Sequence, residues 1–493
     1  MKKLVLSIFL ISLLSGIKAQ DKINRLSLED VIYIAQEQSP DALIAKHKFR
    51  RSYWEWRSYK ATYLPNLSLD GTVPNFNRSI DAVTQPDGSI EYRERKFTEI
   101  SSDLSLRQKI GLTGGEIFLR SGLKRNDNIF PDTTTTSYLS TPVNIGYNQP
   151  IFQYNDFRWD KKIEPMKYEE AMRTYAEDHE QIAITATNHF FDLLIAQISL
   201  EIAKKNYANY DTLYHIAQGR YNLGKIAENE LLQLELNLLK AEASVDNAQL
   251  SYENMLFVLK SFLRIKDNAV ITLIPPTKTF HFDVDIETAV FEAKNNTSEG
   301  LSFERRLLEA ESNLARAKMT GRFDADLYAV FGLTQTADKF ENVYKNPRDQ
   351  QQLVLGLSIP ILDWGQARGQ IKMAESSLEL TKTSIEQERI DFEQNIFLKV
   401  MQFNMQEKQL YISAKADTVA QKRFDVTQKR YMIGKVNDVL ELNQAQIDND
   451  NAKQGYYQAL KTYWNSYFNL RKMTLYDFRE DERIEFDVME VLQ

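Results

Sequence analysis

The stretch RYNLGKI at residues 220–226 occurs a second time as RYMIGKV at residues 430–436, which lies 210 positions further along the chain. Each copy follows a long block without Gly or Pro, residues 166–218 in the first case and 370–433 in the second. As helices these blocks would be about 80 Å and about 95 Å long. Glycine lets a helix end and turn sharply, so the two copies predict the tips of two long helical hairpins. The alternative is a kink within one continuous helix.

Apolar residues recur in both blocks at the spacing of a coiled coil. They are Phe191, Leu194, Ile198 and Ile202 in the first block, and Ile396, Val400, Phe403, Leu410 and Ala414 in the second. This pattern predicts helices that pack on one another, and it indicates no ligand.

Segments with alternating apolar and polar residues lie between the helical blocks and predict strands near 66–74, 142–151, 323–336 and 351–360. The prolines at 150 and 360 again stand 210 positions apart. Residues 102–124 alternate between apolar and polar on both sides of the glycine-rich stretch GLTGG, and this pattern predicts an additional β-hairpin. The glycines do not form a phosphate-binding loop, because the Lys-Ser/Thr of such a loop is missing.

The chain therefore reads as a duplicated domain with mixed helices and strands. Residues 20–275 form the first repeat, with strands at about 66–152, a helical hairpin at 155–265 and its tip near 224. Residues 276–493 form the second, with strands at about 323–360, a hairpin at 366–475 and its tip near 434. Residues 28–43 also resemble residues 286–301, which places Ala35 over Ala293.

The first residues have the composition of a cleaved export signal, which we place at 1–19. Lys2 and Lys3 precede a short apolar run from Leu4 to Leu14, and Ala19 offers a cleavage site. No later stretch is long and apolar enough for a spanning helix, so any membrane crossing is expected through a closed β-barrel.

Composition excludes several classes of function. The chain has no cysteine, and its formal charge of −7 argues against nucleic acid as a partner. The five histidines are scattered, and no nucleophile elbow is present. We expect no catalytic, cofactor or metal site, and we interpret the pair His215 and Asp211 as a surface hydrogen bond.

In these motifs and their spacing the mature chain resembles the TolC-like outer-membrane efflux family. The resemblance rests on the paired RYxxGK motifs, on PIF at 150–152 and PILDWG at 360–365, and on DVLE at 438–441. It implies a homotrimer in which membrane β-barrel strands join a long antiparallel α-helical coiled-coil tunnel, an α+β fold located in the outer membrane with a large periplasmic portion.

The resemblance also implies function and partners. The chain would be a passive exit duct of a tripartite efflux or type I secretion system. Its partners would be a periplasmic adaptor, an inner-membrane pump of the RND or ABC type, and outer-membrane lipid. With the additional hairpin, three subunits would close a barrel of 18 strands rather than 12, and residues 75–98 and 126–137 would be external loops.

Two groups of residues are expected at the periplasmic tips. Leu223, Gly224, Ile433 and Gly434 would present small apolar surfaces to the adaptor. By the resemblance, Glu230 and Tyr431 tie neighbouring helix pairs together in a closed gate.

The resemblance further implies that Asp438 and Glu441 ring the entrance with carboxylates. Repeated around a threefold axis, these groups would favour cations. Lys225 and Lys435 are near enough in sequence to form salt bridges that hold the tips shut. The alternative is that Asp438 and Glu441 only cap and solvate the start of the last long helix.

A periplasmic coiled-coil scaffold or adaptor without a channel is the second hypothesis. It accounts for the signal and the helices but not for the amphipathic strands. The sequence does not specify the transported substrate.

Overall fold

The computed structural model describes residues 24–130, 132–266, 271–276, 280, 282–433 and 439–492. The predicted signal at 1–19 lies outside these residues. The chain forms two compact units. Unit 1 comprises residues 1–50, 171–300 and 389–493, and unit 2 comprises residues 51–170 and 301–388.

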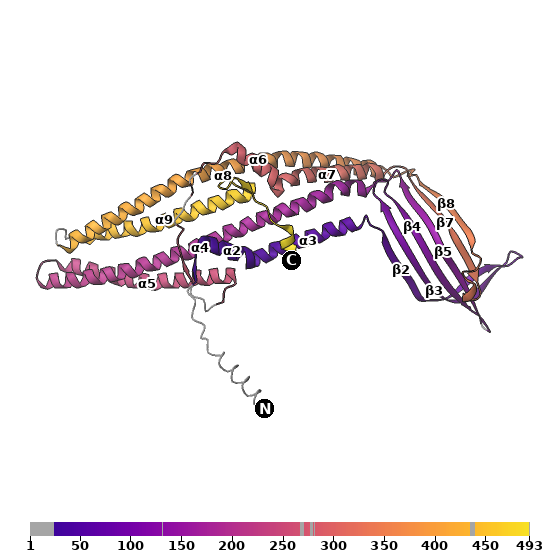
Figure 1. Cartoon of the computed structure of the whole chain (residues 1–493), viewed down its shortest axis with the longest axis horizontal. Coiled ribbons are helices and arrows are strands. Elements are labelled where there is room, and N and C mark those ends of the chain that lie inside the picture. The colour runs from indigo at the N-terminus through magenta and orange to yellow at the C-terminus, as the bar shows by residue number, and fades with distance from the viewer. Residues whose placement is uncertain are drawn as a thin grey trace, which may run out of the picture. The chain divides into compact units, whose positions relative to one another are not determined.

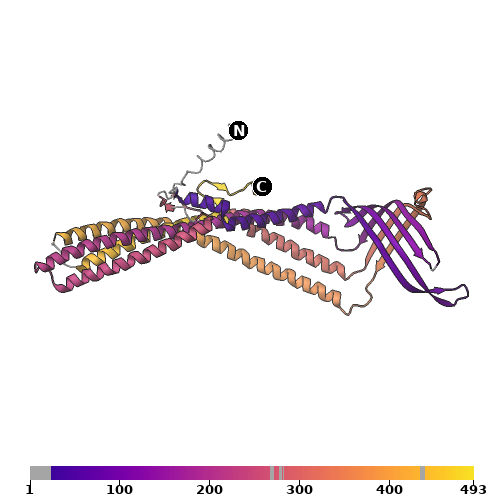
Figure 2. The same cartoon turned by 90° about the horizontal axis from the view of Figure 1, so that it is seen from below.

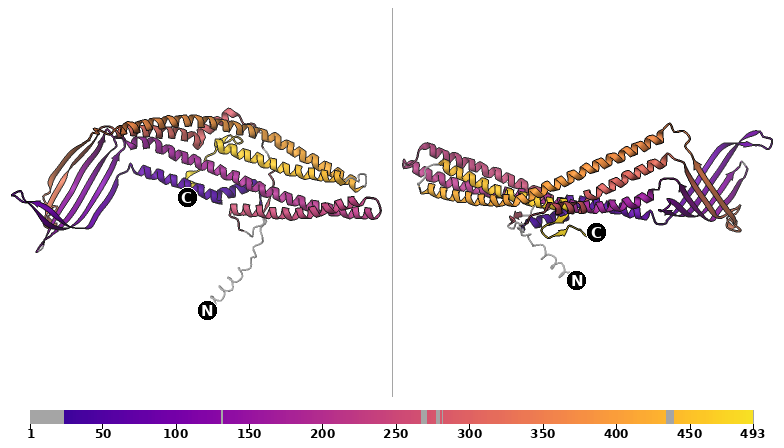
Figure 3. Two further views of the ribbon diagram at one scale, coloured as in Figure 1. Left: turned by 180° about the vertical axis from the view of Figure 1, so that it is seen from behind. Right: turned by 90° about the horizontal axis from the view of Figure 1, so that it is seen from above.

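The helices repeat with nearly constant spacing. Helix α4 (Asp156–Asn222) and helix α8 (Gln366–Met432) are each 67 residues long and begin 210 positions apart. Helix α5 (Glu228–Leu263) and helix α9 (Val439–Thr474) each have 36 residues and run back along α4 and α8 (Figures 1 and 3). The lengths of α4 and α8 match the absence of Gly and Pro from residues 166–218 and 370–433.

A second pair of helices, one in each repeat, also has matching N-caps. Helix α2 (Leu28–Gln38) begins at Ser27, whose side chain accepts from the backbone N–H of Asp30, and helix α6 (Ile286–Asn296) begins at Asp285, which accepts from Thr288. Both helices end at an extended residue and are followed by a longer helix, α3 (Pro40–Ala61) or α7 (Ser298–Thr320). A side-chain N-cap of the same kind thus begins the first helix of each repeat.

Unit 2 contains a six-stranded antiparallel sheet in the order β2-β3-β4-β5-β7-β8 (Figure 1). The strands are β2 (Asn66–Thr84), β3 (Ile90–Ile110), β4 (Gly115–Ile129), β5 (Thr134–Ile151), β7 (Asp324–Ala337) and β8 (Arg348–Ser358). The hairpin expected at 102–124 supplies parts of β3 and β4, which lie inside this sheet between β2 and β5.

The expectation of long external loops at 75–98 and 126–137 is wrong, because most of these residues are in strands. Strands β2 and β3 stay paired from Asn75 opposite Glu99 to Thr84 opposite Ile90. Cross-strand ion pairs, such as Arg95 with Asp81 at 3.7 Å, accompany this pairing. Only a short turn remains at its end, where Gly88 adopts a φ of +85°. These segments carry no local signal of the pairing, because the partner of a strand is not visible in one segment alone.

The two faces of the sheet differ in chemistry. Directly paired residues share a face, and one such row joins five strands. It consists of Leu67, Leu106, Leu119, Ile145 and Phe331, all exposed. On the opposite face the adjacent row is polar, and it consists of Ser68, Ser105, Arg120 and Asn144. One face of the sheet therefore presents an apolar surface, and the other is hydrophilic.

Unit 1 has a core at the contacts of the long helices. Phe191 and Leu194 on α4 and Ile396 and Val400 on α8 are buried, as their coiled-coil spacing indicates. A short parallel pair, β1 (Asn24–Leu26) with β6 (Ile271–Leu273), and a small two-stranded sheet of β9 (Tyr476–Asp477) and β10 (Glu482–Arg483) belong to the same unit (Figure 2 gives a second view of the chain). A final short helix is α10 (Val488–Leu492). Among the helices that the structure describes, none combines the length and hydrophobicity needed to cross a membrane.

Candidate gate and docking site at the helix tips

The turn between α4 and α5 is closed by a glycine in the left-handed conformation. Gly224 has a φ of +67°. Its N–H donates to the carbonyl of Tyr221 at 2.8 Å, and the N–H of Lys225 donates to the carbonyl of Arg220 at 2.9 Å. These two bonds form the Schellman arrangement that ends helices at glycine. Gly224 therefore ends a helix and does not kink one, and the next helix begins four residues later.

The turn between α8 and α9 is described only on its two sides. Helix α8 ends at Met432, and the N–H of Ile433 still donates to the carbonyl of Lys429 at 3.1 Å. The predicted site residues Gly434, Lys435 and Asp438 lie outside the described residues.

Apolar side chains are exposed beside both turns. Leu223 is 75% exposed and Ile433 is 66% exposed. Each lies next to one of the glycines of the repeated motif. Both side chains are therefore accessible in the single chain, and their role in docking stays a prediction.

Tyr431, by contrast, is buried within the ends of the four long helices, with only 1% of its surface exposed. It packs in a cluster with Leu213 and Ala217 of α4, Leu234 of α5, Phe424 of α8, and Val439, Leu442 and Ala445 of α9. The ring thus lies in the contact between the α4–α5 pair and the α8–α9 pair of one chain.

Arg220 fastens the end of α4 to the end of α8. Its Nη2 donates to the carbonyl oxygens of Tyr431 at 3.3 Å and of Met432 at 2.9 Å. Its guanidinium also lies over the Tyr431 ring, 5.4 Å from the centroid. These carbonyls belong to the last turn of α8, where no helical N–H is available to them. The sequence prediction assigned no role to Arg220, although its place in the repeated motif was a usable signal.

Glu230 lies in the first turn of α5 and close to this cluster. Its Oε2 atom is buried and has no hydrogen-bond partner among the described residues. Burial raises the pKa of the Tyr431 phenol, the Arg220 guanidinium acts against this rise, and the Glu230 carboxylate adds to it. The structure therefore brings Glu230, Arg220 and Tyr431 into one electrostatic neighbourhood.

Glu441 lies near the second copy of the same arginine. The distance from its Oε1 to Nη1 of Arg430 is 3.8 Å, and both side chains are about half exposed. This is a weak surface ion pair that links α9 to α8. Lys225, which was expected to form a salt bridge, has no carboxylate partner among the described residues.

A polar layer joins α4 and α9 further from the tips. Asn206 donates to Asp450 at 2.6 Å, Gln446 donates to Asn206 at 2.8 Å, and Tyr210 donates to Asn443 at 2.7 Å. Burial raises the pKa of Asp450, although the amide donors act in the opposite direction. These side chains line a cavity of about 570 Å³ that α5 closes on another side. Sequence analysis did not single out this layer, because its members are far apart in the chain.

The described residues contain no group of three or more His, Asp or Glu side chains that could hold a metal ion. The tips contain instead a packed cluster with a small number of hydrogen bonds between the two helix pairs and one weak ion pair within the α8–α9 pair.

Comparison with known proteins gives one family and several solved structures. The family described as "Outer membrane efflux protein" matches residues 31–263 and 301–474. No curated protein sequence matches the chain. Among solved structures, the Campylobacter jejuni CmeC outer membrane channel aligns with a TM-score of 0.66 and 16% identity, over 94% of this chain and 88% of that one.

Two further structures have the same fold. The outer membrane protein VceC of Vibrio cholerae gives a TM-score of 0.64 at 13% identity, over 91% of this chain and 95% of that one. The open state of the Neisseria gonorrhoeae MtrE outer membrane channel gives 0.61 at 14% identity, over 91% and 88% of the two chains.

Proposed function

Since this chain belongs to the outer membrane efflux protein family, we propose that three copies of it form an outer-membrane exit duct that a periplasmic adaptor connects to an inner-membrane pump. The family is one of efflux channels, and passive export is the activity that it supports. The trimer, the barrel, the adaptor, the pump of RND or ABC type and any role in type I secretion are parts of the proposal.

The observation that carries this proposal is the sheet with two free edges. Strands β2 and β8 are the outer members of the six-stranded sheet, and neither has a second partner among the described residues. Unpaired edges are avoided in membranes, where every backbone polar group needs a partner. Pairing of β2 in one copy with β8 in the next would remove all edges, and three copies of six strands would close a barrel of 18.

The two faces of the sheet support the same arrangement. The row of apolar side chains from Leu67 to Phe331 would face lipid, and the polar row from Ser68 to Asn144 would face a water-filled interior. This is the alternation expected of a barrel with an aqueous lumen.

Exposed stripes on the long helices supply further contacts for neighbouring copies. Helix α8 carries apolar side chains at an interval of seven residues, and each is exposed in the single chain. They are Leu398, Met405, Ile412, Val419 and Val426. Helix α5 carries a similar exposed set, which is Leu232, Leu236, Leu239, Leu250 and Phe257. Stripes with this period pack against other helices, which favours a tunnel built from several copies.

The helix tips would then serve as the adaptor site. Leu223 and Ile433 are exposed and stand beside the turns, so an adaptor could cover them without disturbing the core. Gly224 would allow close approach, because no atom lies within 4 Å of the place where its Cβ would stand. Gly434 is assigned the same role by its position in the repeated motif.

The cluster around Tyr431 would form the gate. Tyr431 and Glu230 lie where the two helix pairs meet, and the surface pair of Glu441 with Arg430 adds a weak link. Such exposed pairs contribute about 0–1 kcal/mol each, so adaptor binding could separate them. Asp438 and Lys435, by sequence position, would complete the charged ring at the entrance.

The test is expression with the native signal in a bacterium that has an outer membrane, followed by fractionation. We expect a band in the outer-membrane fraction that migrates as a trimer before boiling and as a monomer after it. Purified protein should have the mass of three chains by native mass spectrometry and should conduct ions in planar bilayers. A monomer in the soluble periplasmic fraction without conductance would instead support the coiled-coil scaffold.

A further inference from the structure

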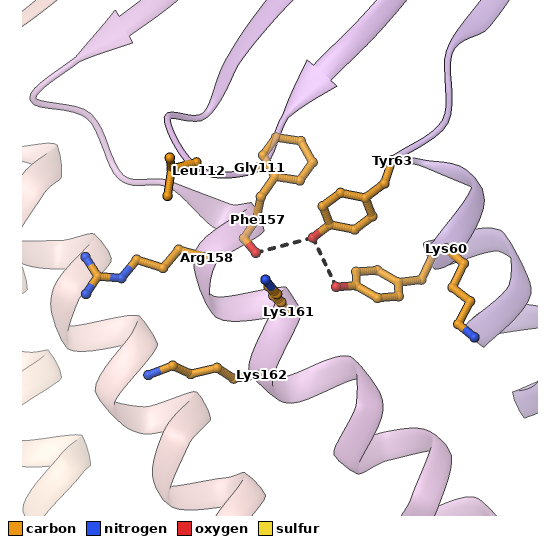
Figure 4. Close-up of a pocket in the computed structure, with 9 residues that line it drawn as sticks. Lys60, Tyr63, Gly111, Leu112, Phe157, Arg158, Lys161 and Lys162 are labelled. Atoms are coloured by element: carbon orange, nitrogen blue, oxygen red, sulfur yellow. Dashed lines mark hydrogen bonds between the residues drawn. The ribbon is translucent and has the colours of Figure 1, made fainter.

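A pocket of about 1030 Å³ lies in unit 2 where the helices meet the sheet. Its walls come from Tyr59 near the end of α3, from Tyr63 just after that helix, from the turn between β3 and β4, and from the first two turns of α4 (Figure 4). The strand register places this turn at the same end of the sheet as the end of β5 and the start of β7. In the proposed duct, this end faces the periplasm.

The walls of the pocket are held in place by hydrogen bonds. The hydroxyls of Tyr59 and Tyr63 are 3.0 Å apart, and the Tyr63 hydroxyl donates to the carbonyl of Phe157 at 3.3 Å (Figure 4). The side-chain amide of Asn155 donates to the carbonyls of Gly111 and Leu112, each at 3.3 Å. These bonds join α3, the β3–β4 turn and α4, so the pocket does not depend on a ligand for its shape.

Positive charge surrounds the pocket without compensating partners. Lys60, Arg158, Lys161 and Lys162 line it and are exposed, and none forms an ion pair with a carboxylate in the described part of the chain. Figure 4 shows the ends of Arg158 and Lys162 extending to the same side, with Lys161 between them and the tyrosines.

The carboxylates near the pocket either form ion pairs with other residues or have a raised pKa. Asp156 pairs with Arg316 at 2.8 Å, and Glu164 pairs with Lys167 at 2.9 Å. Burial raises the pKa of Asp160, and the neighbouring Glu164 and Asp156 add to that rise. The local field is therefore positive, and it favours an anionic ligand.

Apolar surface adjoins the charges. Leu112 is 90% exposed at the β3–β4 turn, and the rings of Tyr59, Tyr63 and Phe157 form the opposite wall. Lys60 lies over the ring of Trp56 at 4.7 Å, and Lys162 lies over Trp159 at 5.6 Å. Aromatic rings beside basic residues are typical of the depth at which lipid headgroups meet acyl chains. A free inorganic anion would make no use of this apolar surface.

We propose that this pocket binds the headgroup phosphate of an anionic phospholipid from the periplasmic leaflet, with Arg158 and Lys161 on the phosphate and Leu112 against the acyl chains. This inference rests on the proposed function, because it requires the sheet to lie in the outer membrane. A bound lipid at this position would fix the depth of the sheet in the membrane.

The test uses purified full-length trimer in nanodiscs that contain phosphatidylcholine with a minority of phosphatidylglycerol. Lipids that remain bound are counted by native mass spectrometry after release from the discs. The Arg158→Gln/Lys161→Gln double variant is compared with Lys339→Gln/Lys345→Gln, which removes the same charge between β7 and β8 at the opposite end of the sheet. Each basic residue near an anionic membrane contributes about fivefold to binding, so we expect the double variant to lose about 25-fold in preference for phosphatidylglycerol.

The control variant should keep the preference of the wild-type protein, and so should the charge-retaining variant Arg158→Lys/Lys161→Arg. Equal retention of phosphatidylglycerol by the wild-type protein and the double variant would overturn the proposal. Displacement of the lipid by excess inorganic phosphate would also overturn it and would assign a site for small anions. Failure of the proposed function would be seen separately, because wild-type protein would then not form trimers in the membrane.

Discussion

The guanidinium of Arg220 lies over the ring of Tyr431 at 5.4 Å, and its Nη2 donates to the carbonyl oxygen of Tyr431 at 3.3 Å. The two residues come from the two copies of one repeated motif, 211 positions apart in the chain. Arg220 of the first motif copy therefore binds the end of α8, the helix that ends within the second copy. A trimer would contain three such contacts around its axis.

Arg220→Gln is expected to loosen the gate. It removes hydrogen bonds from a charged donor to two carbonyls, and such a bond contributes about 1.5–3 kcal/mol. Single-channel conductance in planar bilayers should rise while the trimer stays intact on gels. Arg423→Gln is the matched control, because its ion pair with Asp448 is exposed, is not part of the proposed gate and contributes about 0–1 kcal/mol. Equal conductance of Arg220→Gln and wild type would place the gate elsewhere.

Gly224→Trp is expected to leave trimers and conductance unchanged but to abolish export with the adaptor and pump. The φ of +67° at this position makes any side chain cost about 1–2 kcal/mol, and the indole would stand where the adaptor docks. Export of a pump substrate from cells is the measurement. Gly219→Trp is the control, since Gly219 lies in α4 just before the tip and has open space around its Cβ position. Full export by Gly224→Trp would argue against docking at this tip.

Leu355→Arg is expected to lower the yield of membrane-inserted trimer, whereas Val354→Arg should be tolerated. The two residues are adjacent on β8 and point to opposite faces of the sheet. Leu355 shares the face of the apolar row, where an arginine costs about 2–4 kcal/mol in the middle of a bilayer. Heat-modifiable trimer in the outer-membrane fraction is the readout. The reverse order of the two yields would mean that the faces are assigned the wrong way round.

Asp450→Asn is expected to stabilise the protein at about pH 7.5 but not at about pH 3.5. Burial raises the pKa of Asp450 in the folded state, so the stability linked to its protonated form is complete below the ordinary Asp pKa. That stability is lost as the pH rises through the raised pKa, and asparagine avoids the loss. Thermal unfolding followed by circular dichroism measures the difference. Asp448→Asn, which removes an exposed ion pair with Arg423, should give no gain at either pH.

Asp438→Asn combined with Glu441→Gln is expected to reduce the preference of the channel for cations. Six carboxylates around one axis would create a negative potential at the entrance, and the amides remove it. Reversal potentials in a salt gradient give the permeability ratio. The control is Glu228→Gln, which removes a carboxylate from the first turn of α5. An unchanged ratio would leave capping of α9 as the role of the two acids.

Much of this protein follows from local sequence. The Gly- and Pro-free blocks before the two RYxxGK motifs predict two long helices that end near these motifs, and α4 and α8 are such helices. The prediction succeeds because helix propensity and the turn-forming property of glycine are local. The alternation of residues such as Leu67 and Leu69 predicts which strands have one apolar face, because the period of a strand is local. The resemblance to the efflux family, drawn from the same motifs, is confirmed by the family match over both repeats.

Other features depended on tertiary structure. Residues 75–84 and 90–99 were expected in a loop but pair as strands. Cross-strand hydrogen bonds join residues whose pairing is not visible in the local sequence. Burial of Tyr431 likewise depends on packing against side chains from α4, α5, α8 and α9.

The role of Arg220 and the polar layer around Asp450 have the same origin. Sequence by itself determined the long helices and the periodic faces of the predicted strands, because these depend on neighbours within a few residues. Only the tertiary structure decided which faces and ends meet, because contacts between residues more than 200 positions apart are set by packing of the whole chain and not by any local preference.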